Sequence, residues 1–163
     1  MILPATCYLI ALGSNQRHNI FGRPEHIISA ARAALEQQGL HILKQSKTVS
    51  SRPIGPSHRR YANSAAIIET ALSPVPLLNL LKRIESRFGT RKGQAWSRRV
   101  LDLDIILWSE GAFSASYPPL TIPHPMMRER PFVLQPAAEI AAKWRDPISG
   151  LTIAQIAARH SRP

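Results

Sequence analysis

The chain has 163 residues, 44% of them hydrophobic, which suffices for one sizeable core and excludes two domains of ordinary size, so we expect a single domain over residues 1–163. Its one cysteine, Cys7, excludes an internal disulfide and a cysteine-based zinc site, and it fits a reducing compartment such as the cytoplasm. A net charge of +11 favours a polyanionic partner, either nucleic acid or a nucleotide polyphosphate.

The N-terminal segment predicts a strand, a loop and a helix. Residues 1–12 are apolar, but they lack the basic start of a signal peptide and are shorter than the roughly 20 residues that span a bilayer. We interpret residues 8–12 as a buried first strand, followed by a loop of turn-forming and polar residues over 13–23. Pro24 suits the first turn of a helix, which keeps its apolar residues at helical spacing until Gly39 ends it.

Two further strands and a second helix follow. Residues 40–50 alternate loosely as a strand, and residues 61–70 form the next one, with the stretch 65–68 buried on both sides. Ser73 is a suitable N-cap for a helix whose apolar positions recur at helical spacing until Gly89.

A fourth strand over residues 100–108 completes the order strand, helix, strand, strand, helix, strand. This order indicates the α/β (α+β) fold class, as a ferredoxin-like βαββαβ sandwich with an antiparallel sheet and helices on one face. The last third adds a proline-rich loop over 118–125, a helix near 126–142 and a short helix over 153–158. We therefore expect extra C-terminal helices beside the βαββαβ unit.

Two acids stand out inside the fourth strand, in the sequence Leu-Asp-Leu-Asp-Ile of residues 101–105. Alternate residues of a strand point to the same face, so the carboxylates of Asp102 and Asp104 are expected to lie side by side. Like charges repel there unless a cation joins them, and Mg²⁺ binds one or two carboxylates together with substrate phosphates. The alternative is an exposed strand face on which the acids pair with nearby arginines.

The segment before these acids is strongly basic. Residues 82–99 contain seven lysines and arginines against one glutamate, a net charge of +6, and Arg98 and Arg99 directly precede the strand. Guanidinium groups beside a magnesium site suit phosphoryl transfer, because its catalysis rests on positioning and charge stabilisation. The chain has no Gly-x-x-x-x-Gly-Lys-Ser/Thr and no Gly-x-Gly-x-x-Gly motif, so a nucleotide site here is not of the P-loop or Rossmann type. A merely solvated basic face is the other interpretation.

Two further residues admit both a functional and a structural interpretation. His124 lies between two prolines that restrict its backbone; it could donate to a phosphate, act as an acid, or only shape a turn. Trp96, in the basic loop, could stack on a flat ligand ring or pack on the body of the protein. Residue type and spacing leave both alternatives open.

Six segments of the chain form an ordered set of motifs. They are Ile-Ala-Leu-Gly-Ser-Asn at 10–15, Pro-Ile-Gly-Pro with Tyr-x-Asn at 53–63, Arg-Ile-Glu with Gly at 83–89, Val-Leu-Asp-Leu-Asp-Ile at 100–105, Leu-Thr-Ile-Pro-His-Pro at 120–125, and Arg-Pro-Phe-Val-Leu with Glu-Ile-Ala at 130–141. Together they resemble the 6-hydroxymethyl-7,8-dihydropterin pyrophosphokinase family, from about residue 8 to residue 142.

The resemblance implies an Mg-ATP-dependent diphosphokinase of folate biosynthesis with a ferredoxin-like fold. Such an enzyme passes the β,γ-pyrophosphoryl group of ATP to the hydroxymethyl oxygen of the pterin and releases AMP. Two Mg²⁺ ions are expected on Asp102 and Asp104, across the triphosphate of the co-substrate ATP. The partners are then ATP and a pterin, with no nucleic acid and no membrane, and we expect a cytoplasmic monomer, with a weak dimer as the alternative.

The resemblance also implies roles for individual residues. The catalytic set is Arg91, Lys92, Arg99, Asp102 and Asp104, in which either Arg91 or Lys92 supplies the charge of the basic loop. The pterin-binding set is Ser51, Pro53, Ile54, Tyr61, Asn63, Trp96 and Phe132. The ATP-binding set is Lys82, Glu85, Arg99, Ile105, Thr121, His124 and Arg130.

Two other classes of function fit part of the sequence. A ferredoxin-like RNA-binding module suits the fold and the positive charge, but it needs aromatic residues on the sheet face and has no use for a pair of acids. A regulatory ligand-binding domain without catalysis would keep a pocket and would not need the cluster of arginines. Release of AMP that requires the pterin distinguishes the enzyme from both.

Overall fold

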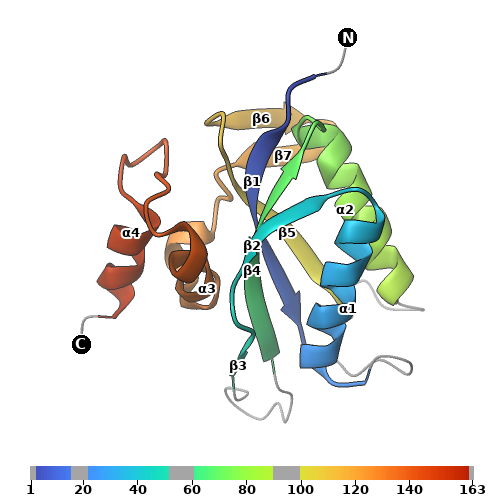
Figure 1. Ribbon diagram of the computed structural model, residues 1–163. Helices are drawn as coiled ribbons and strands as arrows, with labels where there is room; N and C mark the ends of the chain where they lie inside the picture. Colours follow the sequence, from blue (N-terminus) through green and yellow to red (C-terminus); the bar gives the residue numbers. More distant parts are fainter. Residues whose placement is uncertain (1–2, 16–21, 52–60, 90–99, 162–163) are drawn as a thin grey trace.

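The computed structural model describes residues 3–15, 22–51, 61–89 and 100–161. An antiparallel sheet forms its centre (Figure 1), in the order β2-β4-β1-β5, with β3 as a further partner of β4. The strands are β1 (Thr6–Ser14), β2 (His41–Gln45), β3 (Val49–Ser51), β4 (Tyr61–Thr70) and β5 (Asp102–Trp108). The predicted ferredoxin-like arrangement is thereby confirmed.

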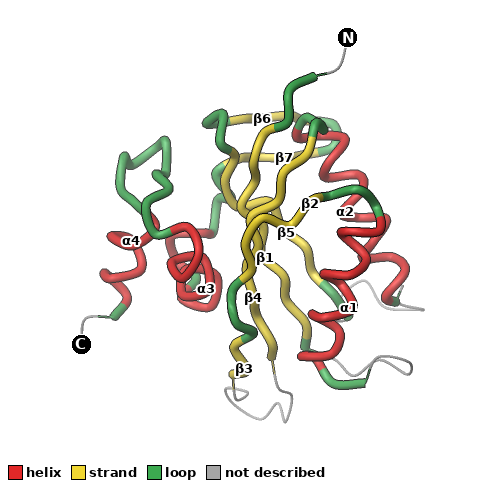
Figure 2. Tube along the Cα trace, in the orientation of Figure 1, coloured by secondary structure: helices red, strands yellow, loops and turns green. Residues whose placement is uncertain are grey.

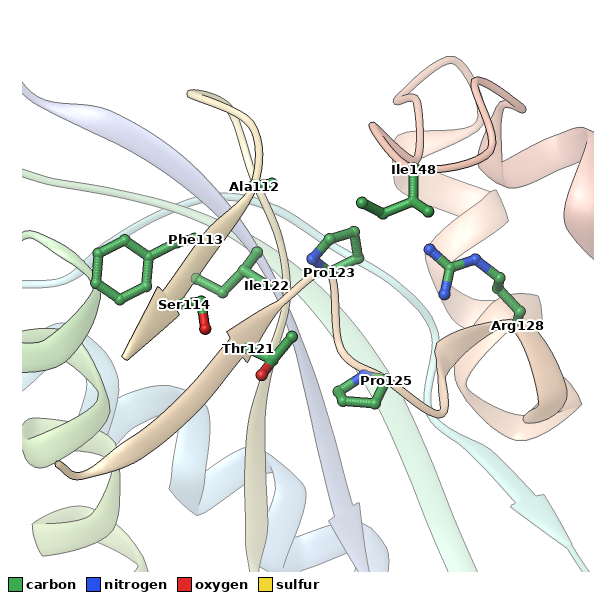
Figure 3. Close-up of a pocket in the computed structure, with 9 residues that line it drawn as sticks. All are labelled: Ala112, Phe113, Ser114, Thr121, Ile122, Pro123, Pro125, Arg128 and Ile148. Carbon is green, nitrogen blue, oxygen red and sulfur yellow. The ribbon is translucent and has the colours of Figure 1, made fainter. Parts of the chain in front are cut away.

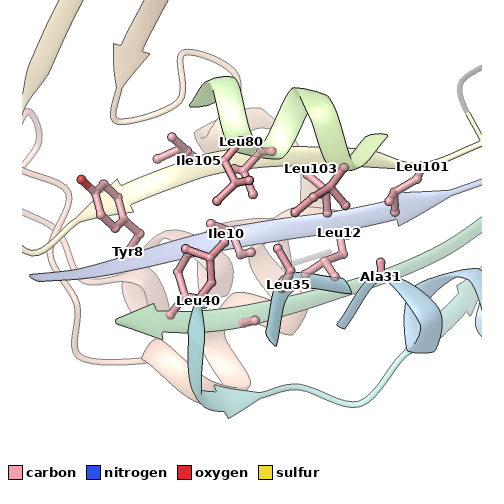
Figure 4. Packing of buried hydrophobic residues seen from close by; sticks show 14 of the residues in the cluster. Tyr8, Ile10, Leu12, Ala31, Leu35, Leu40, Leu80, Leu101, Leu103 and Ile105 are labelled. Carbon is pink, nitrogen blue, oxygen red and sulfur yellow. The ribbon is translucent and has the colours of Figure 1, made fainter. Parts of the chain in front are cut away.

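One face of the sheet is covered by α1 (Pro24–Gln37) and α2 (Pro74–Phe88), which lie side by side in Figures 1 and 2. Both helices begin with a proline, where the missing N–H removes no intrahelical hydrogen bond. Alternate residues of β1 and β5 pack against the apolar stripes of these helices (Figure 4). The predicted N-cap, Ser73, stands at the right position, but its side chain makes no capping hydrogen bond.

The opposite face is covered by the C-terminal part of the chain, so the molecule has three layers. Helix α3 (Pro131–Ala141) packs on β4 and β1, and α4 (Ile153–His160) packs on α3. The apolar side chains that β1, β4 and β5 direct to this face are buried beneath α3. The prediction of helices on one face is therefore correct for α1 and α2 only.

The predicted strand over residues 40–50 is wrong as a single element. It is divided into β2 and β3 at Ser46, which is buried and replaces regular pairing with two bonds to β4. The Ser46 N–H donates to the Ala65 carbonyl over 2.9 Å, and the Ser46 hydroxyl accepts from the Ala65 N–H over 2.8 Å. A buried hydroxyl thus satisfies a backbone group at the break.

Two segments of the last third also differ from expectation. The predicted proline-rich loop contains the strand β7 (Pro119–Ile122), which forms a hairpin with β6 (Phe113–Ser116) just before the loop. The helix predicted near 126–142 is divided into a short 3-10 helix, η1 (Met127–Glu129), and α3. The division falls where Pro131 disfavours a helical backbone at the preceding residue. Within the described ranges, no helix is long and apolar enough to cross a membrane.

Candidate functional site

The two acids of β5 lie on the sheet face opposite α1 and α2. Leu103 and Ile105, which alternate with them, are buried in the cluster beneath those helices. Asp102 and Asp104 therefore share the opposite face, in agreement with the alternation expected of a strand. Asp102 is exposed and Asp104 is half-buried. Consecutive same-face residues of a strand are about 7 Å apart along the chain, a separation that one polyphosphate with its cations spans.

A bulge ends this alternation just beyond the acids. Leu9 of β1 pairs with Leu107 and Ile10 pairs with Ile105, so Ile106 is an extra residue in β5. Ile106 and Leu107 both join the cluster beneath α3. The acids therefore occupy the end of β5 before the bulge, and apolar side chains fill the same face after it.

Two residues of the predicted pterin pocket, Tyr61 and Asn63, lie on the same face as the acids. Asn63 pairs with Gly13 of β1, and Gly13 pairs with Asp102 on its other side, so the three form one row across three strands. Adjacent strands are about 5 Å apart, so the row separates Asn63 from Asp102 by about 10 Å. A Cβ atom at position 13 would lie 3.3 Å from Oδ1 of Asn63. Glycine therefore leaves room for the amide at the centre of the row.

The start of α3 presents Phe132 and Arg130. The Phe132 side chain is 49% exposed, and Cζ of Arg130 lies 5.9 Å from its ring centroid. Phe132 shares a helical stripe with Glu139, seven residues on, whose carboxylate accepts from the Lys47 N–H at 3.2 Å. Since Lys47 lies between β2 and β3, this stripe of α3 faces the β3 side of the sheet.

His124 is held at the outer edge of β5. Its N–H donates to the Ile106 carbonyl over 3.0 Å, and its Nδ1 accepts from the Met126 N–H over 3.1 Å. Because Nδ1 is an acceptor, the proton of the neutral ring is on Nε2, which is therefore a donor. Burial lowers the His124 pKa and Asp104 opposes that shift, while Arg130 and Lys82 add to it. These four side chains thus share one electrostatic neighbourhood.

Glu85 has protein partners on two sides. Its side chain is 8% exposed, and its Oε1 accepts from the Leu103 N–H over 2.7 Å, between the two acids in sequence. Lys82, one turn earlier in α2, lies 3.3 Å from the carboxylate. The resemblance assigns Glu85 to ATP binding, which stays a prediction; in the structure its carboxylate holds the strand that carries the acids.

Two other residues predicted to bind ATP lie in different surroundings in the structure. The Ile105 side chain is buried in the core at 3% exposure, which leaves only its backbone for a ligand. Thr121 is exposed on β7 and lines a pocket of about 390 Å³ between the hairpin and the loop around Ile148 (Figure 3). Arg128 lines the same pocket.

Several predicted site residues lie outside the described part of the chain. They are Pro53, Ile54, Arg91, Lys92, Trp96 and Arg99, and of Ser51 only the backbone pairing with Tyr61 is described. In the described residues no group of three or more histidine, cysteine and acidic side chains could hold a metal ion. The donor set that fits a hard cation is the pair Asp102 and Asp104, with further oxygen ligands from a substrate.

Sequence reasoning did not identify Gly13 or the pair of Arg128 and Asp146 as parts of the site and its support. Sequence reasoning places Gly13 in the loop after the first strand, whereas β1 continues to Ser14, so the sequence carries no signal of a close approach between strands at position 13. Arg128 and Asp146 are 18 residues apart and follow no periodic pattern, so nothing in the sequence indicated that they meet.

The model of the family described as 7,8-dihydro-6-hydroxymethylpterin-pyrophosphokinase (HPPK) matches residues 9–142 of the chain. A 2-amino-4-hydroxy-6-hydroxymethyldihydropteridine pyrophosphokinase of Synechocystis is 42% identical over 118 residues, which are 72% of this chain and 60% of that protein. The Haemophilus influenzae protein of the same name is 39% identical over 134 residues, 82% of this chain and 80% of that protein. The crystal structure of wild-type Plasmodium falciparum HPPK-DHPS shares the fold, with a TM-score of 0.70, 12% identity and coverage of 96% of this chain and 41% of that chain.

Proposed function

We propose that this chain, which belongs to the 7,8-dihydro-6-hydroxymethylpterin-pyrophosphokinase family, transfers the pyrophosphoryl group of Mg-ATP to 6-hydroxymethyl-7,8-dihydropterin in the cytoplasm. The hydroxymethyl oxygen forms a bond to the β-phosphorus of ATP and loses its proton. The bond from that phosphorus to the bridging oxygen of the α-phosphate breaks, and AMP leaves. The products are AMP and the pterin diphosphate.

The observation that carries the proposal is the shared face of Asp102, Asp104, Asn63 and Tyr61. Acids for a metal-bound triphosphate and side chains suited to a flat heterocycle stand on one sheet face, about 10 Å apart across Gly13. An RNA-binding module would expose aromatic residues across such a face, and it has no use for two acids on a strand. The separation instead suits a small molecule at one end of the row and a phosphate chain at the other.

Each group in the neighbourhood has a task in this proposal. Bound Mg²⁺ would neutralise charge on the triphosphate. Nε2 of His124 donates to a phosphate oxygen as a neutral imidazole, and Arg130 adds a permanent positive charge beside it. Tyr61 and Phe132 stack on the pterin ring while the Asn63 amide binds its edge. Glu85, through the Leu103 N–H, keeps the acid strand in register.

The test is release of AMP from ATP in the presence of Mg²⁺ and 6-hydroxymethyl-7,8-dihydropterin. We expect AMP only when both the pterin and Mg²⁺ are present. Asp104→Asn should lower kcat/KM at least 100-fold, whereas Glu110→Gln, an exposed acid just after the same strand, should leave it within about twofold. Near-normal turnover by Asp104→Asn would exclude the metal role of the acid pair, and salt-sensitive RNA binding without turnover would exclude the enzyme.

A further inference from the structure

The last part of the chain, after the family match ends at residue 142, contains a buried acid with an arginine partner. Asp146 is 0% exposed, and its Oδ2 and Oδ1 accept from Nε and Nη2 of Arg128 over 2.6 and 2.7 Å. The same carboxylate accepts from the Ile148 N–H at 2.9 Å and the Ser149 hydroxyl at 2.7 Å. Four donors therefore hold one carboxylate, and the two from Arg128 form a planar fork.

Arg128 is the middle residue of η1, between His124 and Arg130 in the chain. The C-terminal part of the chain also holds the Arg128 backbone, because Nε2 of His160, at the end of α4, donates to the Arg128 carbonyl over 2.6 Å. The C-terminal part thus holds Arg128 by both its side chain and its backbone. Figure 3 shows the Arg128 side chain extending from η1 toward the loop that carries Ile148.

Internal hydrogen bonds make residues 124–130 one hydrogen-bonded segment. The Met127 N–H donates to the His124 carbonyl over 3.1 Å, and the Arg130 N–H donates to the Met127 carbonyl over 3.3 Å. A 3-10 helix of three residues has too few hydrogen bonds to be stable alone. Its placement therefore depends on contacts from outside the segment: the His124 bond to the Ile106 carbonyl, the burial of Met127 beneath α3, and the pair of Arg128 with Asp146.

The pair of Arg128 and Asp146 fixes geometry more than it adds stability. Asp146 is buried while the Arg128 side chain is 33% exposed, and such a pair gains little net stability because the carboxylate must leave water. A bidentate pair instead fixes direction and distance. The same segment lies beside the acid strand, because the His124 N–H donates to the carbonyl of Ile106, two residues after Asp104 in β5, and Arg130 ends the segment.

We propose that Asp146 is a positioning residue for the nucleotide side of the site: through Arg128 it holds segment 124–130 so that Nε2 of His124 and the guanidinium of Arg130 face the acid strand. This inference rests on the proposed function for its ligand, ATP. Phe132 is fixed separately, because Val133 and Leu134 anchor α3 in the core. Loss of the Asp146 contact should therefore affect ATP and leave the pterin side unchanged.

The kinetic test compares Asp146→Asn and Arg128→Lys with a matched control. The control is Arg145→Ala, which removes a hydrogen bond to the Gly150 carbonyl in the same loop without touching Arg128. At a temperature where all variants are folded, we expect the two pair variants to raise KM for ATP at least tenfold, with KM for the pterin within twofold of wild type. The control should leave both values within twofold. Unchanged KM for ATP, or equal rises for both substrates, would overturn the proposal.

A second measurement is independent of turnover. Amide hydrogen exchange of the ligand-free protein should become at least tenfold faster at Met126, Met127 and Arg130 in Asp146→Asn, with no change in β1 and β4. Exchange that stays at the wild-type rate would also overturn the proposal. If the wild-type protein releases no AMP, the proposed function fails while this comparison still decides the positioning role.

A third variant covers the case in which Asp146→Asn does not fold. Ser149→Ala removes one of the donors to Oδ2 of Asp146 and leaves the arginine in place. It should speed exchange in segment 124–130 about two- to threefold. Exchange at the wild-type rate in a folded Ser149→Ala protein would count against the role of Asp146.

Discussion

Removing the carboxylate of Glu85 should destabilise the strand that carries the two acids. In Glu85→Ala the Leu103 N–H, which is buried and now donates over 2.7 Å to Oε1, loses its partner. A hydrogen bond to a charged acceptor contributes about 1.5–3 kcal/mol net, and the cost of leaving a buried donor unpaired is of similar size. The pair with Lys82 adds at most about 1 kcal/mol, since that lysine is 42% exposed.

The expected loss in the free energy of unfolding is therefore about 2–4 kcal/mol for Glu85→Ala. Glu85→Gln keeps a carbonyl oxygen that can accept from Leu103, so its loss should be nearer to 1 kcal/mol. Urea unfolding at constant pH measures both values. Ser86→Ala, an exposed neighbour in the same helix, serves as the control and should change stability by less than about 0.5 kcal/mol.

Loss of the Glu85 carboxylate should also change nucleotide binding. Leu103 lies between Asp102 and Asp104, so a looser strand should weaken Mg²⁺-dependent nucleotide binding in Glu85→Ala more than in Glu85→Gln. Two results would refute the argument. One is a loss below about 1 kcal/mol in Glu85→Ala, and the other is equal destabilisation by alanine and glutamine.

Three further predictions concern stability. Gly89 has φ +145°, and a Cβ there would lie 2.9 Å from Cγ2 of Val100, so Gly89→Ala should lower the unfolding free energy by about 1–3 kcal/mol in urea; an unchanged midpoint would contradict this. Thr152→Ala, which removes the capping box of α4, should cost about 0.5–2 kcal/mol in the same assay, and no loss would argue against that cap. Burial raises the pKa of Asp146, but hydrogen bonds from Arg128 and other donors lower it by more, so the pKa falls from 3.8 to about 2. The stability that this shift contributes, about 2 kcal/mol, is therefore present above about pH 4 and lost as pH falls through about 2. The difference in unfolding free energy between wild type and Asp146→Asn should shrink from pH 5 to pH 2. A difference that stays constant over this range would contradict the prediction.

The regular elements could be predicted because their apolar residues follow simple periods. Tyr8, Ile10 and Leu12 alternate in β1, and Leu77, Leu81 and Ile84 repeat at helical spacing in α2. The departures from regularity could not be predicted. The bulge at Ile106 depends on how β5 pairs with β1, and nothing in its local sequence marks it.

The hairpin of β6 and β7 was not predicted, because part of its segment is rich in proline. A proline-rich stretch favours a loop, yet Pro119 is tolerated as the first residue of β7 because a strand start need not donate to a ladder. The hairpin forms because Phe113 and Leu120 pack against the main core, a contact that local propensity does not contain.

The candidate site was predictable to the extent that it lies within a single strand. Asp102 and Asp104 share a face by strand geometry alone. By contrast, the row through Asn63, Gly13 and Asp102 requires the register of three strands. Long-range contacts of this kind are visible only once the fold is known.

The outer edge of β5 has a consequence for behaviour in concentrated solution. An edge strand with unpaired backbone groups is a template for another chain and so promotes aggregation. Here Glu85 accepts from the Leu103 N–H, and the His124 N–H donates to the Ile106 carbonyl, so these groups are already bonded within the molecule. On the far side of the sheet, β2 is irregular between Ile42 and Lys44 and exposes the lysine. The same contacts that fix the acid strand thus protect it from pairing with a second molecule, and a variant at Glu85 should show self-association before it shows complete unfolding.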